Sequence, residues 1–175
     1  MLGATPAKYQ GETDKLLSDC AHIMGKGDTF HSVDVGVYFG ESGKKDADPY
    51  FDGKGPDRMG CTLCGGCMVG CRYNAKNTLD KNYLYLAEQL GITILPEQEV
   101  QDVLPLEDGG YQVTIRKTTG INRPIQKLQS KKVILSGGVM GTVKLLLKCR
   151  DNGSLNALSN KLGDFVRTNS EAILG

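Results

Sequence analysis

The sequence predicts a mixed α/β (α+β) fold, and three patterns support this prediction. Residues 13–24 and 78–90 each carry apolar side chains at helical spacing, and a glycine follows each segment. Residues 29–39 alternate apolar and polar side chains, which is typical of a strand with one buried face. Residues 132–149 pass from an apolar run through a glycine turn into a helical pattern. With 175 residues, the chain is long enough for one domain or two small ones.

The first half of the chain is expected to hold one helix, one strand and two irregular segments. Thr13 can cap the first helix, and Gly25 follows its last residue. The strand over residues 29–39 places its valines on one face. Residues 40–60 are rich in Gly, Asp, Lys and Pro, which predicts a loop, and the cysteine-rich run after them predicts irregular structure.

The second half is expected to hold a hairpin and a strand–turn–helix unit. Asp108-Gly109-Gly110 is a turn signal between two strand-like segments. Thr142 is expected to cap a helix that ends near Cys149, and the tail over 154–175 is expected to be irregular. The strands are expected at 92–95, 100–106, 111–117 and 132–136.

Composition narrows the classes of function. The net charge is +1, so there is no electrostatic case for nucleic acid or an anionic membrane surface. No signal peptide opens the chain and no apolar run is long enough to predict a transmembrane segment. Two of the six cysteines, Cys20 and Cys149, lie far from the other four, which is unlike a disulfide-stapled secreted domain. We therefore expect a cytoplasmic protein.

Four cysteines lie close together, and they are Cys61, Cys64, Cys67 and Cys71, with the spacing C-x2-C-x2-C-x3-C. This is the spacing that binds an iron–sulfur cluster in bacterial ferredoxins. Glycines between the cysteines allow the backbone to turn so that several sulfur atoms can face one point. The run therefore predicts four metal ligands and makes a [4Fe–4S] cluster a candidate cofactor.

Other interpretations of the cysteine run stay open. The fourth cysteine of a ferredoxin run usually ligates a second cluster, yet this chain has one run, and Arg72 stands where ferredoxins have proline. A single cluster could use all four cysteines, or three of them with Cys20 or Cys149. Tetrahedral zinc is a further candidate, although zinc usually binds two C-x2-C pairs separated by a longer loop. The run could also be a packed turn or form a disulfide.

The glycine turn at residues 137–142 is the second candidate site. A strand that leads through glycines into a helix presents free N–H groups and the positive end of the helix dipole, which suit cofactor phosphates and flavin edges. The segment Gly137-Gly138-x-x-Gly141 is not the G-x-G-x-x-G fingerprint. An ordinary turn between a strand and a helix explains this segment equally well.

Four segments of the chain resemble the glucose–methanol–choline (GMC) family of flavoprotein oxidoreductases. The segment 60–88, which holds the cysteine run, is similar to the central part of that family, and within it to the bacterial cholesterol oxidase-like branch. Gly-Asp-Thr-Phe-His at 27–31, Val-Ile-Leu-Ser-Gly-Gly-Val-Met-Gly-Thr at 133–142 and Arg-Thr-Asn-Ser-Glu-Ala-Ile-Leu-Gly at 167–175 resemble the same branch. The four segments follow the order of the family.

The resemblance implies an FAD enzyme that transfers a hydride from an alcohol or sterol carbon to flavin, with O2 or a redox partner as electron acceptor. It implies an incomplete Rossmann-like FAD-binding domain with part of a mixed-sheet substrate domain. Residues 1–60 would belong to the substrate side, 61–75 to the cysteine-rich ferredoxin-like loop, 76–150 to the FAD-binding domain and 151–175 to a return toward the substrate domain. The implied FAD contacts are Val100, Gly137, Gly138, Gly141 and Thr142.

The resemblance also implies an internal fragment. The family's N-terminal G-x-G-x-x-G unit has no counterpart in this chain, and the catalytic residues of the family are expected C-terminal to it, so no catalytic residue is assigned here. Two competing hypotheses remain: an iron–sulfur electron-transfer module built on Cys61–Cys71, and a binding fragment without catalysis.

Overall fold

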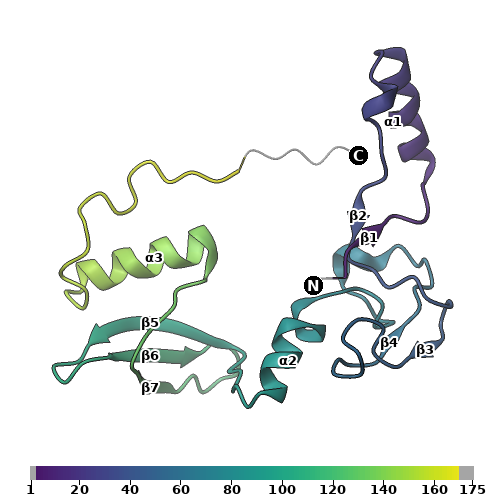
Figure 1. The fold of residues 1–175 in the computed structure, drawn as a ribbon. Helices are drawn as coiled ribbons and strands as arrows, with labels where there is room; N and C mark the ends of the chain where they lie inside the picture. Colours follow the sequence, from purple (N-terminus) through teal and green to yellow (C-terminus); the bar gives the residue numbers. More distant parts are fainter. Residues whose placement is uncertain (1–2, 170–175) are drawn as a thin grey trace. The chain divides into compact units, whose positions relative to one another are not determined.

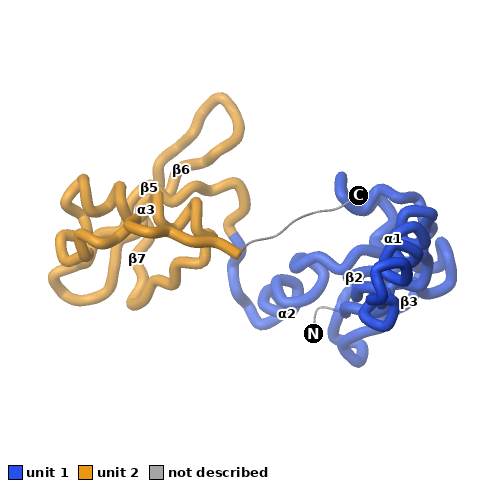
Figure 2. The backbone as a smooth tube through the Cα atoms, turned by 90° about the horizontal axis from the view of Figure 1, so that it is seen from above, with its two compact units in different colours: residues 1–94, 175 blue, residues 95–174 orange. Residues whose placement is uncertain are grey.

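The computed structural model describes residues 3–169, and these divide into two compact units, residues 3–94 and 95–169 (Figure 2). The last residues of the expected 151–175 segment, and of the resembling segment 167–175, lie outside the described residues. In the described part of the chain, no helix has the length and apolar character needed to cross a membrane.

The second unit is built on a three-stranded antiparallel sheet with the order β5-β6-β7. Its strands are β5 (Gln98–Pro105), β6 (Tyr111–Lys117) and β7 (Ile125–Ser130). The helix α3 (Gly138–Asp151) lies along one face of this sheet (Figure 1). The buried side chains of this unit are Val103, Ile115 and Cys149, so its core lies between β5, β6 and α3.

The predicted hairpin is confirmed. Gly109 and Gly110 have φ of 90° and 84°, the left-handed region that the turn needs and that glycine adopts without a steric penalty. A Cβ at Gly110 would also lie 2.7 Å from the carbonyl oxygen of Ser130. The turn therefore requires glycine for its conformation and for the close approach of the chain that leaves β7.

One strand prediction in this unit is wrong, as is one at the junction of the two units, and one strand was missed. Residues 132–136 form no strand, and Ile134 is 89% exposed, because no neighbouring strand in the described chain pairs with them. Residues 92–95 are likewise not a strand. The missed strand β7 has six exposed residues, so its sequence lacks the apolar alternation that marks a half-buried strand.

The helix α3 begins four residues earlier than predicted, at Gly138 instead of Thr142. Its last turns attach to β5 through polar contacts: Lys148 Nζ donates to Gln101 Oε1 at 3.0 Å, and Ser154 Oγ just after the helix donates to Asp102 Oδ2 at 2.8 Å. Cys149 is fully buried beside them, which raises the pKa of its thiol. Gly153, with φ of 78°, lies in the turn that follows the helix.

The first unit has little regular structure. The strand predicted over 29–39 is wrong for most of its length, since only β2 (Asp34–Val35) pairs, with β1 (Thr5–Pro6), and Val37 makes one further bridge to Lys76. Few segments lie beside residues 29–39, so the alternating pattern has almost no partner strand. The predicted loop over 40–60 contains one small antiparallel pair, β3 (Lys45–Asp46) with β4 (Arg58–Met59).

Both helices predicted for the first unit are present, with changed lengths. The helix α1 (Glu12–Ile23) matches the prediction within one residue at each end, although it has no buried residue. The segment predicted as a helix over 78–90 splits into a 3₁₀ turn at Leu79–Lys81 and α2 (Tyr83–Gln89). Asn82 causes the break, because it adopts a non-helical conformation and its side chain accepts a hydrogen bond from the Tyr83 amide at 2.6 Å.

Arg58 is the most connected side chain of the first unit, and it is 2% exposed. Its Nε donates to the Asn74 carbonyl at 3.2 Å, and its Nη2 donates to the carbonyls of Ala75 and Lys76 at 3.0 and 2.8 Å. Its Nη1 donates to Asn77 Oδ1. The guanidinium therefore ties β4 to the whole of residues 74–77.

Replacing Arg58 should unfold the first unit more easily than replacing a surface arginine. We expect Arg58→Ala to lower the free energy of unfolding by about 3 kcal/mol, because one buried and two partly buried carbonyls lose their donor. Arg116→Ala is the matched control. Arg116 forms an exposed ion pair with Glu99 at 3.4 Å, so its loss should cost less than about 1 kcal/mol. Urea unfolding measures both, and equal losses would contradict the role assigned to Arg58.

Candidate functional site

The cysteine run forms a loop whose two ends are fixed to the first unit. At its beginning, the Cys61 amide donates to the Tyr38 carbonyl at 3.0 Å. At its end, the Tyr38 amide donates to the Ala75 carbonyl at 2.8 Å, and Arg58 binds the residues that follow. The two ends of the loop are therefore held on the same residue, Tyr38. Cys61 and Cys71 lie at these ends and are partly buried, whereas Cys64 and Cys67 lie on the exposed tip.

All four cysteines of the run line one cavity of about 540 Å³. The walls are mostly apolar, and Val35, Val37 and Phe39 contribute to them from the segment predicted as a strand. The cavity lies wholly within the first unit. The structure thus brings the four predicted sulfur ligands around one space.

Two of the sulfur atoms accept hydrogen bonds from backbone amides. The Leu63 amide donates to Cys61 Sγ at 3.4 Å, and the Ala75 amide donates to Cys71 Sγ at 3.3 Å. Burial raises the pKa of the Cys71 thiol, but amide donors from residues 73–76 and the charge of Lys81 outweigh it, so this pKa lies below its ordinary value. Cys71 is therefore the cysteine of the run whose thiolate the structure favours.

The four cysteines do not form a ready ligand set in this structure. Within residues 3–169, no three His, Cys, Asp or Glu side chains are placed so that they could hold a metal ion together. The described cysteines are all free thiols, Cys20 and Cys149 included, so the disulfide alternative is absent there as well. The geometry gives no support to a preformed iron–sulfur or zinc centre.

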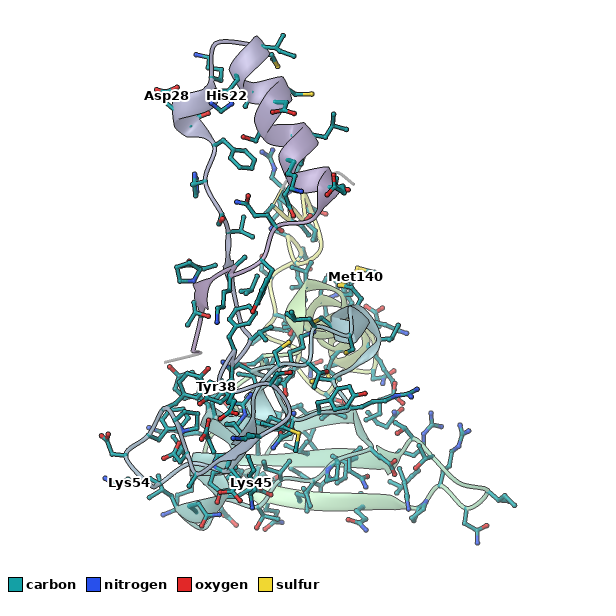
Figure 3. The ribbon with its side chains drawn as sticks, turned by 90° about the vertical axis from the view of Figure 1, so that its right-hand side faces the viewer. His22, Asp28, Tyr38, Lys45, Lys54 and Met140 are labelled. Atoms are coloured by element: carbon teal, nitrogen blue, oxygen red, sulfur yellow. The ribbon has the colours of Figure 1, made fainter. Side chains whose placement is uncertain are left out.

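Tyr38 also forms a side-chain contact that the sequence did not indicate. The hydroxyl of Tyr38, a residue labelled in Figure 3, donates to Oδ2 of Asp46 on β3. This hydrogen bond, with burial and the negative charge of Asp46, raises the pKa of Tyr38 to about 12. Residues 38 and 46 carry no motif, so only the folded loop could reveal the pair.

The glycine turn of the second unit has the conformation that a ligand-binding turn needs. Gly138 has φ of 66°, and the structure leaves open space where a Cβ would stand at Gly138 and at Gly141. Thr142 does not cap the helix as predicted. Instead its Oγ1 accepts a hydrogen bond from the Gly137 amide at 3.1 Å. This bond joins the first and last residues of the turn.

The N-terminus of α3 is open. Gly137, the residue before the helix, has no side chain that could cap it, so the first amides of a helix of 14 residues face outward. Apolar side chains flank these amides, and Met140, labelled in Figure 3, is 86% exposed. The turn can therefore accept an anionic or carbonyl oxygen at the helix end and an apolar surface beside it.

Val100 was also predicted to contact the cofactor. No hydrogen bond among the described residues joins it to the glycine turn. It lies on β5, beside the register shift between Val100 and Asp102. The contacts of β5 with α3 involve the last turns of the helix, at Lys148. Lys148 is about 15 Å along the helix from Gly138, since each residue rises 1.5 Å.

Comparison with known proteins finds one matching family model and similar relatives. Residues 55–149 match the family model described as GMC oxidoreductase. The chain is 45% identical over 185 aligned positions to a cholesterol oxidase of Acinetobacter baumannii, and 42% identical over 181 to a cholesterol oxidase of Mycobacterium tuberculosis. Both alignments cover all of this chain and about a third of the relative, at 33% and 31%.

The phenol of Tyr38 should titrate above its ordinary pKa of 10.0. Because its pKa is raised above the ordinary 10.0, its hydrogen bond stabilises the fold below pH 10, and that contribution is lost as the pH rises from about 10 to 12. An absorbance titration of the seven tyrosines should show this late component, and Tyr38→Phe should remove it. Tyr9→Phe is the control and should leave the late component in place. A late component that survives in Tyr38→Phe would contradict the assignment.

Proposed function

The chain belongs to the GMC oxidoreductase family, and from that premise we propose that it forms part of an FAD-dependent enzyme that oxidises the hydroxyl group of an alcohol or sterol. The relatives named cholesterol oxidase support the choice of a sterol over other alcohols. The chain spans about a third of those relatives, so the activity belongs to the whole protein.

The observation that carries this proposal is the glycine turn inside the family match. The turn at residues 137–142 lies within the matched residues 55–149 and combines a left-handed glycine with the open N-terminus of α3. Helix N-termini suit phosphate and carbonyl oxygens because their amides are unpaired and the helix dipole is positive there. FAD carries both kinds of oxygen.

The residues at the turn fit part of FAD. Gly138 and Gly141 leave space for the approach of a ligand to the backbone, and the exposed side chain of Met140 offers apolar contact for a ring system. Thr142 fixes the conformation of the turn by accepting a hydrogen bond from the Gly137 amide. Its proposed role is therefore to position the turn and not to contact FAD. Val100 is retained as a proposed contact on the family resemblance alone.

Bound FAD supplies the acceptor for the hydride of the alcohol carbon. The residues of this chain would bind and orient the cofactor through the turn and α3. No catalytic residue is assigned within it, and the base that takes the hydroxyl proton is proposed to lie outside the chain. Either O2 or a redox partner is proposed as the electron acceptor. A cytoplasmic location is also proposed, on the distribution of the cysteines along the sequence.

The iron–sulfur electron-transfer module is not proposed as the function of this chain. The cysteine run lies inside the matched residues 55–149, so it is a segment of the oxidoreductase family and not a separate ferredoxin-like unit. The described side chains provide no ready metal site that would favour that alternative.

Gly138→Val in the whole protein tests the proposed cofactor site. Valine is strained at φ of 66° and fills the open side of the turn, so we expect the flavin content per chain to fall at least about tenfold. Gly153→Val is the matched control, because it introduces the same strain at the other end of α3, where φ is 78°. The control should lose stability and keep its flavin. Normal flavin content in Gly138→Val would show that the turn is an ordinary connection.

A further inference from the structure

The thiols of the cysteine loop line one cavity of the first unit, and the proposed oxidation of an alcohol uses none of them. The described side chains offer no ready metal site, and the cysteines of the loop are free thiols. Free thiols grouped around one space react with one another when an oxidant reaches them. The loop is therefore a candidate for thiol chemistry of its own.

We propose that Cys71 and Cys67 form a reversible disulfide when hydrogen peroxide enters this cavity. The Cys71 thiolate attacks peroxide, so that an S–O bond forms, the O–O bond breaks, and hydroxide leaves and takes up a proton. The sulfur is oxidised to a sulfenic acid, and the peroxide is reduced to water. The Cys67 thiolate then attacks the Cys71 sulfur, so that an S–S bond forms and the sulfenic oxygen leaves as a second water.

The surroundings of Cys71 identify it as the attacking thiol. The Ala75 amide donates to Cys71 Sγ at 3.3 Å, and further amides of residues 73–76 donate to the same sulfur. The positive charges of Lys81 and Arg58 also act on it. Amide donors and nearby cations favour the thiolate, which is the form of cysteine that attacks peroxide.

Cys67 is the cysteine that the structure links to the surroundings of Cys71. Lys76 Nζ donates to the Cys67 carbonyl at 2.7 Å, while the Lys76 amide donates to Cys71 Sγ. Gly70 lies between the two cysteines with φ of 105° and open space where a Cβ would stand, so no side chain hinders a turn of the backbone there. Cys67 is exposed on the tip of the loop, so its thiol can reach Cys71 without unpacking a core.

The cavity has room for peroxide and offers it a hydrogen bond. Its volume of about 540 Å³ is ample for so small a molecule. The hydroxyl oxygen of Thr62, a residue that lines the cavity, is buried and forms no hydrogen bond. A buried hydroxyl without a partner calls for a polar molecule beside it. A hydrogen bond to the leaving oxygen of peroxide stabilises the negative charge that develops there as the O–O bond breaks.

The disulfide goes beyond the proposed function and depends on it only for a source of oxidant. Reduction of O2 by the electron pair taken from an alcohol yields hydrogen peroxide, so a protein that uses O2 as acceptor exposes this loop to its own product. In a cytoplasmic protein, cellular thiols reduce such a disulfide again, and disulfides there are usually transient and redox-sensing.

Differential thiol labelling of the whole protein tests the proposal. The protein is reduced, freed of reductant without oxygen and treated with hydrogen peroxide. The remaining thiols are blocked with one alkylating agent, and the thiols released by a second reduction are labelled with another. Trypsin cuts after Arg58 and Arg72, so the whole cysteine run lies on one peptide, and its fragmentation spectrum shows which label each cysteine carries.

We expect the second label on Cys71 and Cys67 to rise at least about tenfold over the protein not treated with peroxide. The fully buried Cys149 is the internal control and should carry the first label only after the chain is unfolded. No second label on Cys71, or second label on Cys71 together with a cysteine other than Cys67, would overturn the proposal.

Two variants separate the disulfide from a general sensitivity of exposed thiols. In Cys67→Ser the sulfenic acid has no partner thiol, so dimedone, which traps sulfenic acids, should label Cys71 at least about tenfold more than in the unchanged protein. Cys64→Ser is the matched control, because Cys64 is also exposed on the tip, and it should form the disulfide as before. A disulfide of Cys71 that forms in Cys67→Ser, or that is lost in Cys64→Ser, would overturn the proposal. The labels report on thiols alone, so the result is independent of flavin content and of the alcohol substrate.

Discussion

The buried guanidinium of Arg58 is the interaction on which the first unit depends. This unit has few regular elements and strands of only two residues, so its backbone polar groups must be satisfied outside long ladders. Arg58 does this for the carbonyls of residues 74–76 and also stacks on Tyr50, with its Cζ 5.6 Å from the ring centroid. Burial lowers the pKa of this guanidinium, yet arginine stays charged because its ordinary pKa is so high. Arg58 therefore fixes the residues that follow the cysteine loop.

The two units use different means to hold a site in place. In the second unit, a regular sheet and a helix of 14 residues position the glycine turn, and Thr142 closes it. In the first unit, hydrogen bonds of Arg58 and Tyr38 fix both ends of a loop whose tip stays exposed. A turn on a rigid helix suits a cofactor that must be oriented for reaction.

The elements that the sequence predicted well carry their signals locally. The helix at α1 and the hairpin at Asp108-Gly109-Gly110 follow from helical spacing and from turn residues, and both signals act within a few positions. The strand predicted at 29–39 and the one predicted at 132–136 needed partner strands, and the described chain offers few or none. Pairing depends on the rest of the fold, so alternation alone could not decide these segments.

The candidate sites were likewise predictable only where the sequence carries a local signal. The spacing of the four cysteines placed them on one loop, and the structure shows that they share one cavity. The roles of Arg58 and Tyr38 could not be predicted from the sequence, because neither belongs to a motif and both act through residues 8 to 37 positions away. Thr142 was identified as part of the glycine turn, but as a helix cap, and its bond to the Gly137 amide appears only in the folded chain.

The most direct test of the account is the reduction of bound flavin by an alcohol substrate. The whole protein, purified with its flavin and kept without oxygen, is mixed with cholesterol in detergent, and the visible absorption of the flavin is followed. We expect the flavin absorption to bleach on mixing with cholesterol and to return when an electron acceptor is added. A protein that contains no flavin, or whose flavin is reduced by dithionite but by neither cholesterol nor simpler alcohols, would contradict it.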